Sequence, residues 1–587
     1  MTINIINSVN EEQNCLESIN SEQFFNYVVQ YNGNLNMISQ TFGDDVCVNI
    51  INGQYAIAYR RLSGEPSDME DILKPGYEFV PKCYGLMDVD ADEKSGVTAL
   101  KNLPGLSLSG NNTLVGFVDT GIDYTLNMFR KTDGSSRIRY IWDQGSDVES
   151  NMSEEIGHFG FGALYTREDI NQALREENPY SIVGERDDNG HGTFMASVAA
   201  GGNVGIADGA EIVVVKVRQV KDNLRQFYAV PQEEFCCGED DVMLGVRFLI
   251  EVAQVLGRPL TICLGIGTNL GAHEGRSLLE RYLTFITSFR NICVVTPVGN
   301  ELGAGTHYRG GTMIPFQPVE EDVEISVDED VGGFSMEIWA KAPVYLNVSI
   351  ISPTGQLFGG ISPFRDGFVT GRFLYEGTEV DVLNIAIDTT VGTQMLFIRF
   401  RNVVEGIWKL RISETAGARG EGYDSWLPIR QFTNGKVSFV SPDSETTICA
   451  PGSANGPITV TAYNVENDTL YSQSSRGFNR RGFIKPELAA SGVAVIGAFA
   501  GSGYSPGRED LLISRSGSSV SAAIVAGMVC MILEWAVVKG NVPNIENEMI
   551  KRFLVSGTIK QDTLSYPNPS WGWGAVNLLE SFSLIRI

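Results

Sequence analysis

The sequence predicts an α/β protein whose main domain is a mostly parallel sheet, with a small α+β unit before it and an all-β domain inserted into it. Three observations lead to this prediction. Unbroken apolar runs, which are typical of parallel strands buried on both faces, alternate with helical stretches in two separate parts of the chain. Between these parts the pattern changes to short alternating segments separated by turns. Ahead of them lie the signals of a hairpin and a short helix.

The N-terminal unit is expected over residues 1–83. Strands are predicted at 24–31, 46–51 and 54–59. Asn52-Gly53 is a strong two-residue hairpin signal between the last two of these strands. A proline followed by early acidic residues predicts a short helix over 66–73. These elements make a small α+β unit.

The main domain is predicted in two parts, 84–310 and 441–587. Apolar runs predict parallel strands at 114–118, 212–217, 260–264 and 292–296, and a further strand is predicted at 458–462. Helices are predicted at 241–255 and 275–289. A long apolar helix is expected after Ser519. The alternation of strands and helices predicts a layered α/β domain.

The inserted domain is expected over residues 311–440. Short alternating segments lie at 335–340, 345–351, 373–375, 380–387, 395–401 and 407–412. Turn residues separate them, and no helical period of useful length is present. This pattern is typical of an antiparallel β-sandwich or jelly roll.

Composition and charge exclude several classes of function. The chain has 587 residues, 43% of them hydrophobic, which is an ordinary globular composition and argues against disorder. The formal net charge is −27, from 44 Lys and Arg against 71 Asp and Glu. Such a field repels phosphate backbones, so we expect no nucleic-acid partner.

The cysteines and the N-terminus indicate the compartment. Nine cysteines, an odd number with no paired C-x-x-C spacing, are too sparse for a disulfide framework. Most lie in apolar surroundings, so we expect them to be reduced and buried. The N-terminus lacks a basic stretch followed by an apolar one, so we expect synthesis inside the cell without a signal peptide.

The segment 520–538 has the length and composition of a membrane span. It is almost wholly apolar, broken only by Glu534, and contains Gly527 and several small residues. A helix that is apolar all round also suits the core of a large soluble domain. We favour the core helix and expect no membrane span.

Three short segments carry candidate catalytic side chains. Asp119 follows an apolar strand, His191 enters a helix between two glycines, and Ser519 opens the apolar helix after a glycine-containing turn. Each has an ordinary structural explanation when taken alone: a turn aspartate, a structural histidine and an N-cap serine. Their order along the chain, Asp then His then Ser, is the order of the subtilisin triad.

These segments resemble the motifs of the subtilases, the subtilisin-like serine proteases. Asp119-Thr120-Gly121, His191-Gly192-Thr193 and Gly517-Ser518-Ser519 match the three catalytic motifs of that family. Further matches are Val298-Gly299-Asn300-Glu301, Cys263-Leu264-Gly265, 473–477 and 485–490. The resemblance implies a three-layer subtilisin-like fold, with the longest apolar helix in its core. It also implies a catalytic triad of Asp119, His191 and Ser519.

The same resemblance assigns the rest of the site. Asn300 is expected to donate to the oxyanion, and the substrate is expected to lie along Cys263, Leu264, Gly265, Val298 and Gly299. No cofactor is expected; calcium is common in subtilases, but no ligands for it are evident. A cysteine hydrolase finds no support, since no cysteine lies in a glycine-flanked turn with a histidine partner. A metal enzyme lacks an H-E-x-x-H pattern.

The domain layout and some loop sequences also resemble the Csp germination proteases of clostridial spores. The resemblance implies that residues 1–83 are a prodomain, cleaved autocatalytically between about Tyr77 and Met87 and then held in the active site. It implies a protein substrate, the precursor of a spore cortex-lytic enzyme, and a location in the spore cortex or coat region. The alternative is a catalytically silent or only self-cleaving scaffold that relays a germinant signal by binding.

Overall fold

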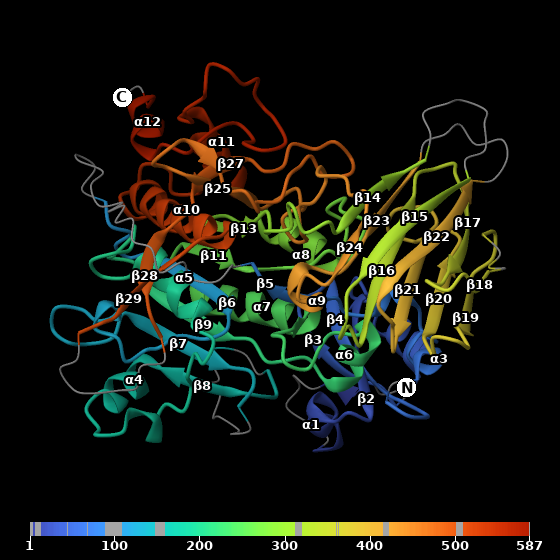
Figure 1. The fold of residues 1–587 in the computed structure, drawn as a ribbon. Coiled ribbons are helices and arrows are strands. Elements are labelled where there is room, and N and C mark those ends of the chain that lie inside the picture. The colour runs from blue at the N-terminus through green and yellow to red at the C-terminus, as the bar shows by residue number, and fades with distance from the viewer. Residues whose placement is uncertain are drawn as a thin grey trace.

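The computed structural model has a layered α/β body with a β-sandwich on one side and the N-terminal unit below (Figure 1). It describes residues 4–5, 13–43, 45–66, 68–87, 108–146, 156, 159–311, 320–359, 361, 363–414, 422–500 and 509–585. The predicted fold class is confirmed: a mostly parallel sheet between helices, preceded by an α+β unit and carrying extra antiparallel sheets.

The central sheet has nine strands in the order β26-β25-β13-β11-β6-β9-β7-β8, with β27 also paired to β25. Its strands are β6 (Leu114–Asp119), β7 (Ile138–Asp143), β8 (Ala163–Thr166), β9 (Glu211–Lys216), β11 (Leu260–Leu264), β13 (Ile292–Pro297), β25 (Ile458–Asn464), β26 (Thr469–Leu470) and β27 (Leu488–Ser491). All neighbours pair in parallel except β7 with β8 and β25 with β26. The apolar runs are therefore the buried parallel strands that the sequence predicts.

Helices cover both faces of this sheet. On one face lie α5 (His191–Ala200) and α10 (Ser518–Leu533). They form one core cluster with the side chains of β6 and β9 that point to this face of the sheet. On the other face lie α7 (Glu239–Leu256) and α8 (Leu278–Ile286), packed against the opposite side chains of the same strands. The remaining helices of the body are α4 (Arg167–Ala173), α6 (Asp222–Tyr228), α11 (Asn547–Ser556) and α12 (Leu578–Ser583). A two-stranded sheet of β28 (Val495–Ala498) and β29 (Leu512–Arg515) lies beside α5.

The longest apolar segment is a core helix. Within the described part of the chain, one helix is long and apolar enough to cross a membrane, Ser518–Val538, and 83% of its most apolar 18-residue window is buried inside the protein. Every residue of α10 is buried, and Glu534 after it accepts backbone N–H groups of Ser109, Gly110 and Asn111. Burial by protein and a satisfied carboxylate support the core-helix interpretation.

The inserted segment folds into two antiparallel sheets with their own core. One sheet contains β14 (His307–Gly310), β16 (Gly333–Ala340), β19 (Gly367–Arg372), β20 (Glu379–Ile385), β21 (Met395–Arg401) and β23 (Tyr423–Trp426). The other contains β15 (Glu320–Val327), β17 (Leu346–Ile351), β18 (Leu357–Phe358), β22 (Gly406–Glu414) and β24 (Val437–Phe439). A short helix, α9 (Arg430–Thr433), joins β23 to β24.

One predicted strand of this domain is wrong. The segment 373–375 is a turn that follows β19, in which Leu374 and Tyr375 are 80% and 83% exposed. The Phe373 N–H donates to Thr378 O, and Gly377 has φ +75°. The aromatic residues imitate a strand, but the glycine turn reverses the chain before β20.

The N-terminal unit is a four-stranded sheet with helices. Its elements are β1 (Asn4–Ile5), α1 (Gln13–Asn20), β2 (Phe24–Gln30), α2 (Leu35–Phe42), β3 (Cys47–Ile50), β4 (Tyr55–Arg61) and α3 (Met69–Ile72). The predicted hairpin joins β3 to β4, with Asn52 Oδ1 accepting the N–H groups of Gln54 and Tyr55. The predicted helix over 66–73 shortens to α3, because Asp68 caps it.

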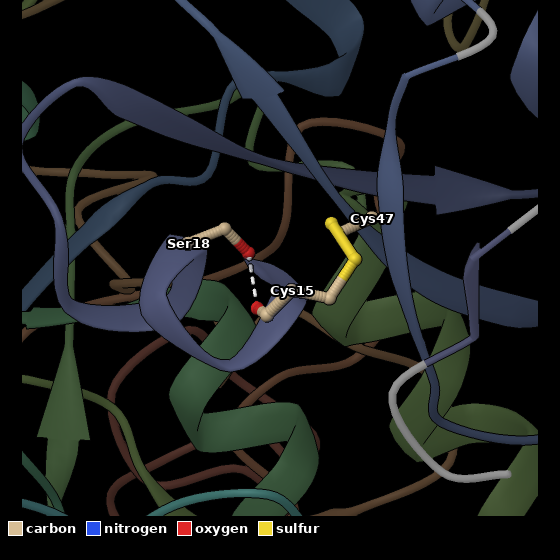
Figure 2. Close-up of a disulfide and its surroundings, with 3 residues drawn as sticks. All are labelled: Cys15, Ser18 and Cys47. Carbon is tan, nitrogen blue, oxygen red and sulfur yellow. Dashed lines mark hydrogen bonds between the residues drawn. A yellow bond between two sulfur atoms is a disulfide. The ribbon is translucent and has the colours of Figure 1, made fainter. Parts of the chain in front are cut away.

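A disulfide in this unit corrects the prediction that the cysteines are unpaired. Cys15 on α1 and Cys47 on β3 are joined, with Cα atoms 5.5 Å apart, and both are buried (Figure 2). The other seven cysteines are free and buried, as expected. The pair has no spacing signal, since it forms only when α1 folds onto the sheet.

The N-terminal unit packs on α6 and α7. The Glu22 carboxylate accepts the backbone N–H groups of Asp222 and Asn223 at the start of α6. Lys221 Nζ donates to the carbonyl oxygens of Ser18 and Phe24. Side chains of α1, β3 and β4 share a core cluster with α7. The unit is thus held by both apolar and charged contacts.

Candidate active site

The three predicted catalytic residues lie together at one edge of the central sheet. Asp119 is the last residue of β6, and His191 and Ser519 lie in the first turns of α5 and α10. His191 Nδ1 lies 2.6 Å from Asp119 Oδ1, and its Nε2 lies 3.4 Å from Ser519 Oγ. All three side chains are at most 1% exposed. The arrangement is that of a nucleophile, a base and an orienting carboxylate.

The Asp187 carboxylate hydrogen-bonds both of the segments that carry Asp119 and His191. Its Oδ1 accepts the Thr120 hydroxyl and the Gly190 N–H, both at 2.8 Å. Its Oδ2 accepts the Thr193 N–H and hydroxyl at 2.8 and 2.6 Å. The carboxylate therefore ties the end of β6, which carries Asp119, to the N-terminus of α5, which carries His191. Asp187 lies four residues before His191, and the sequence motifs did not single it out.

Two donors converge on one carbonyl oxygen beside Ser519. Asn300 Nδ2 lies 2.7 Å from Met87 O, and the Ser519 backbone N lies 3.4 Å from the same oxygen. Asn300 Oδ1 accepts the Ser518 N–H at 3.0 Å, which fixes the amide so that Nδ2 faces the carbonyl. Ser518 Oγ also accepts the Gly299 N–H at 3.0 Å. Donors arranged in this way stabilise negative charge on the oxygen that they contact.

The chain's own strand β5 (Cys83–Leu86) leads to this carbonyl. It lies antiparallel between β10 (Cys237–Gly238) and β12 (Ile266–Gly267) in a three-stranded sheet. The next residue, Met87, donates its N–H to Gly265 O at 3.0 Å and is 2% exposed. A peptide held in this way presents its carbonyl carbon to the Ser519 hydroxyl.

Of the residues predicted to bind substrate, Gly265 contacts this segment, since its carbonyl oxygen accepts the Met87 N–H. A Cβ at Gly265 would lie 2.6 Å from His191 Cε1 and 2.8 Å from Asp119 Oδ2, so glycine is required there. Cys263 and Leu264 are buried in β11, where burial raises the pKa of the Cys263 thiol well above its usual value. Cys263 is therefore a protonated core residue, paired with Val295 and Phe117 inside the central sheet.

Val298 and Gly299 contact Cys449, which shares a core cluster with Met87. Val298 O accepts the Cys449 N–H at 2.8 Å, and Gly299 has φ +97° with the Cys449 thiol against its Cα. A Cβ at Gly267 would lie 2.9 Å from Met87 Sδ and 3.0 Å from Cys449 Cβ. The pocket for the Met87 side chain is thus apolar and closed by Cys449, which sequence reasoning did not single out.

No group of three or more His, Cys, Asp or Glu side chains that could hold a metal ion occurs within the described ranges. The other histidines of the described chain, His273 and His307, stack on the two faces of Trp426 between the sandwich and the body. Burial lowers the pKa of His273 to about 4. His158 lies outside the described residues.

Comparison with known proteins agrees with this geometry. In a search of curated proteins, the chain is 27% identical over 216 residues to subtilisin-like protease SBT6.1 of Arabidopsis thaliana, covering 36% of this chain and 17% of that protein. It is 32% identical over 149 residues to serine protease AprX of Bacillus subtilis (strain 168), covering 23% of this chain and 31% of that protein. The chain therefore spans less than a third of each of these two relatives.

A solved structure, that of the Clostridium perfringens CspB protease, is similar over most of both chains. The TM-score is 0.68 at 29% identity, covering 81% of this chain and 95% of that one. The model of the Subtilase family matches residues 110–229 and 378–574, which together are more than half of the chain. The chain therefore belongs to the subtilase family of serine endopeptidases.

Proposed function

We propose that this chain is a serine endopeptidase that cleaves the peptide bond following Met87 in its own sequence. The observation that carries the proposal is the position of the Met87 carbonyl oxygen, 2.7 Å from Asn300 Nδ2 and facing the Ser519 N–H. In an enzyme of this family, that is where the oxygen of a scissile carbonyl belongs. The N-terminal unit up to Met87 is then a prodomain.

The proposed reaction is acyl transfer to water. Ser519 Oγ attacks the Met87 carbonyl carbon while His191 Nε2 takes the hydroxyl proton. Asn300 and the Ser519 N–H stabilise the negative oxygen, and Asp119 holds the imidazolium through Nδ1. His191 then gives the proton to the amine of Asp88 as the C–N bond breaks. Water, deprotonated by His191, hydrolyses the Met87 ester and restores Ser519.

The 3.4 Å between His191 Nε2 and Ser519 Oγ is long for a hydrogen bond. Catalytic hydrogen bonds are often long in resting structures and shorten as the reaction proceeds. The 2.6 Å between His191 Nδ1 and Asp119 Oδ1 already fixes the tautomer in which Nδ1 carries the proton and Nε2 is the base.

The proposal is tested by comparing wild type with Ser519→Ala after denaturation. We expect two fragments from wild type and one intact chain from Ser519→Ala. Ser288→Ala, which changes an exposed serine on the opposite layer, is the matched control and is expected to cleave like wild type. A single intact species in wild type would contradict the proposal.

We further propose a second protein as substrate: the precursor of a spore cortex-lytic enzyme, activated when its pro-peptide is removed in the spore. The similarity to the Clostridium perfringens CspB protease supports this. The purified precursor should lose its pro-peptide on incubation with wild type and stay intact with Ser519→Ala. A precursor left intact by both would contradict this substrate.

One observation favours a second candidate, an enzyme that cleaves itself once and then acts by binding. Strand β5 is hydrogen-bonded along both edges, and Met87 is almost fully buried, so the cut strand would continue to fill the cleft. This candidate predicts complete self-cleavage together with an unchanged cortex-lytic precursor. Size-exclusion chromatography distinguishes the two candidates, because it shows whether the N-terminal fragment leaves the rest of the chain after cleavage.

A further inference from the structure

The inserted β domain supplies a cover over the strand that occupies the active site. Residues 429–432, on the connection between β23 and β24, lie directly against Gly85 of β5. We call these residues the roof segment. Ile429 and Phe432 of the roof segment are 1% and 4% exposed and belong to the same core cluster as Met87 and Cys83.

The roof segment leaves no room for a side chain at Gly85. A Cβ there would lie 2.6 Å from Ile429 Cδ1 and 3.2 Å from Phe432 Cε1, with Gln431 Oε1 closer still. Real Cβ atoms essentially never approach other atoms within 3.0 Å. The backbone of Gly85 has no positive φ, so space and not conformation requires glycine here.

The side chains around Gly85 are held in place. Gln431 Oε1 accepts the Leu86 N–H at 2.9 Å, and its Nε2 donates to Phe235 O at 3.4 Å. The Arg430 N–H donates to Glu301 Oε2 at 2.9 Å, which ties the roof segment to the loop of Asn300. Ile429 lies in a packed core. Such neighbours do not move aside without losing hydrogen bonds or packing.

The neighbouring positions of the strand differ from Gly85 in this respect. Tyr84 and Met87 bury complete side chains, and the Leu86 side chain is half-buried against the core cluster that includes α7 and α8. The cleft therefore accepts large side chains at the first, second and fourth residues before the proposed cut. Only the third position is closed.

We propose that the roof segment restricts this protease to polypeptides with glycine as the third residue before the cleaved bond. The proposal rests on the proposed function and adds a substrate class to it: an extended segment of the form aromatic–Gly–apolar–Met, in its own chain and in a second protein. The specificity comes from the inserted domain, since Ile429, Gln431 and Phe432 all belong to that insertion.

The test measures self-cleavage of Gly85→Val, with Gly53→Val as the matched control. Gly53 lies in the same N-terminal unit, without positive φ, and a Cβ there meets nothing within 4 Å. We expect Gly85→Val to cleave roughly tenfold to a hundredfold more slowly than wild type, and Gly53→Val to cleave normally. Equal rates in Gly85→Val and wild type would overturn the proposal.

A roof-opening variant separates a steric effect from a folding defect. Adding Ile429→Ala and Gln431→Ala to Gly85→Val removes the two closest side-chain ends, and cleavage should recover by about tenfold. If cleavage stays low in this combined variant, the roof segment is not the cause and the proposal fails. Wild type that does not cleave at all would overturn the proposed function instead.

A readout without cleavage keeps the inference testable in that case. In a Ser519→Ala background, Gly85→Val should lower the thermal midpoint relative to Gly53→Val. Adding Ile429→Ala and Gln431→Ala should reduce this difference in thermal midpoint, because these substitutions make room for the valine side chain and let strand β5 bind in the cleft again. Equal thermal midpoints in Gly85→Val and Gly53→Val, or a difference that the roof-opening substitutions leave unchanged, would overturn the proposed restriction at Gly85.

Discussion

Asn300 is oriented before any charge develops on a substrate. Its Oδ1 accepts the Ser518 N–H, and its Nδ2 faces the Met87 carbonyl. A donor that is already positioned needs no rearrangement at the transition state, and this is the main source of its effect. The geometry thus gives one side chain a measurable role.

Asn300→Ala should therefore slow self-cleavage by on the order of a hundredfold to a thousandfold. The measurement is the rate at which the intact chain disappears after synthesis. Asn455→Ala, at an exposed asparagine on the same body, is the control and should cleave like wild type. An Asn300→Ala chain that cleaves at the wild-type rate would remove Asn300 from the oxyanion site.

Glu301, the next residue, gives a pH dependence. Burial raises its pKa to about 7, and the Arg430 N–H partly offsets this by donating to it. Since the pKa is higher in the folded state than in the unfolded one, the folded chain binds the proton more tightly. The resulting stabilisation is complete below about pH 4.5 and is lost as pH rises through 7.

Glu301→Gln should remove this dependence. We expect the free energy of unfolding of the parent, relative to Glu301→Gln, to fall by up to about 3 kcal/mol between pH 4.5 and 7.5. Urea unfolding at several pH values, in a Ser519→Ala background that keeps the chain intact, measures the difference. A difference that stays constant with pH would contradict the raised pKa.

At the scale of single elements, the disulfide ties α1 to β3 across 32 residues of sequence (Figure 2). A link of this length removes conformational freedom from the unfolded chain. Helix α1 also carries Ser18 and Ile19, whose carbonyl oxygens accept from Lys221 and Arg218 of the body. The disulfide therefore holds in place the helix that docks the N-terminal unit.

Replacing both cysteines, as Cys15→Ser/Cys47→Ser, should lower the free energy of unfolding of the N-terminal unit by about 3–4 kcal/mol. Urea unfolding under non-reducing conditions measures it. A reducing agent should lower the stability of the parent chain and leave the double variant unchanged. Equal responses of the two chains to the reducing agent would show that the link does not form.

Regular elements were predictable because their signals are local. The runs that became β6, β9, β11 and β13 are predominantly apolar, as strands buried on both faces require. The Asn52-Gly53 hairpin carries its turn signal within two residues. The turn at 373–375 was mistaken for a strand because Leu374 and Tyr375 are exposed, and exposure depends on the surrounding fold.

At the scale of the whole molecule, Glu337 joins three parts of the chain. It lies in β16 of the sandwich, and its carboxylate accepts the Tyr77 hydroxyl of the N-terminal unit and the Gly271 N–H of the body. The Trp339 indole N–H donates to it as well, at 2.9 Å. Glu337 is fully buried, so water could not take the place of its carboxylate as an acceptor for these donors.

Glu337→Ala should lower the free energy of unfolding by roughly 3 kcal/mol or more, because it leaves several buried donors without an acceptor. It should also loosen the N-terminal fragment after cleavage, which size-exclusion chromatography detects. Glu405→Ala, at an exposed glutamate of the same domain, is the control. Equal thermal midpoints in the two variants would contradict this role for Glu337.

The catalytic motifs could be predicted from the sequence, but the roof segment that covers the active-site strand could not. Asp119, His191, Ser519 and Asn300 stand in short segments that resemble motifs of the family. The roof segment, in contrast, is brought to Gly85 across 344 or more positions of sequence by the fold of the inserted domain. Cys449 reaches the Met87 side chain in the same way. Contacts of this kind have no local pattern.

The most direct test of the account is the identity of the C-terminal residue of the N-terminal fragment. Mass spectrometry of the denatured wild-type protein should find a fragment of residues 1–87 that ends at Met87, and its partner beginning at Asp88. Ser519→Ala should give neither. A fragment that ends at any other residue would mean that the Met87 carbonyl is not the one that Ser519 attacks, and the strand in the cleft would be an inhibitor only.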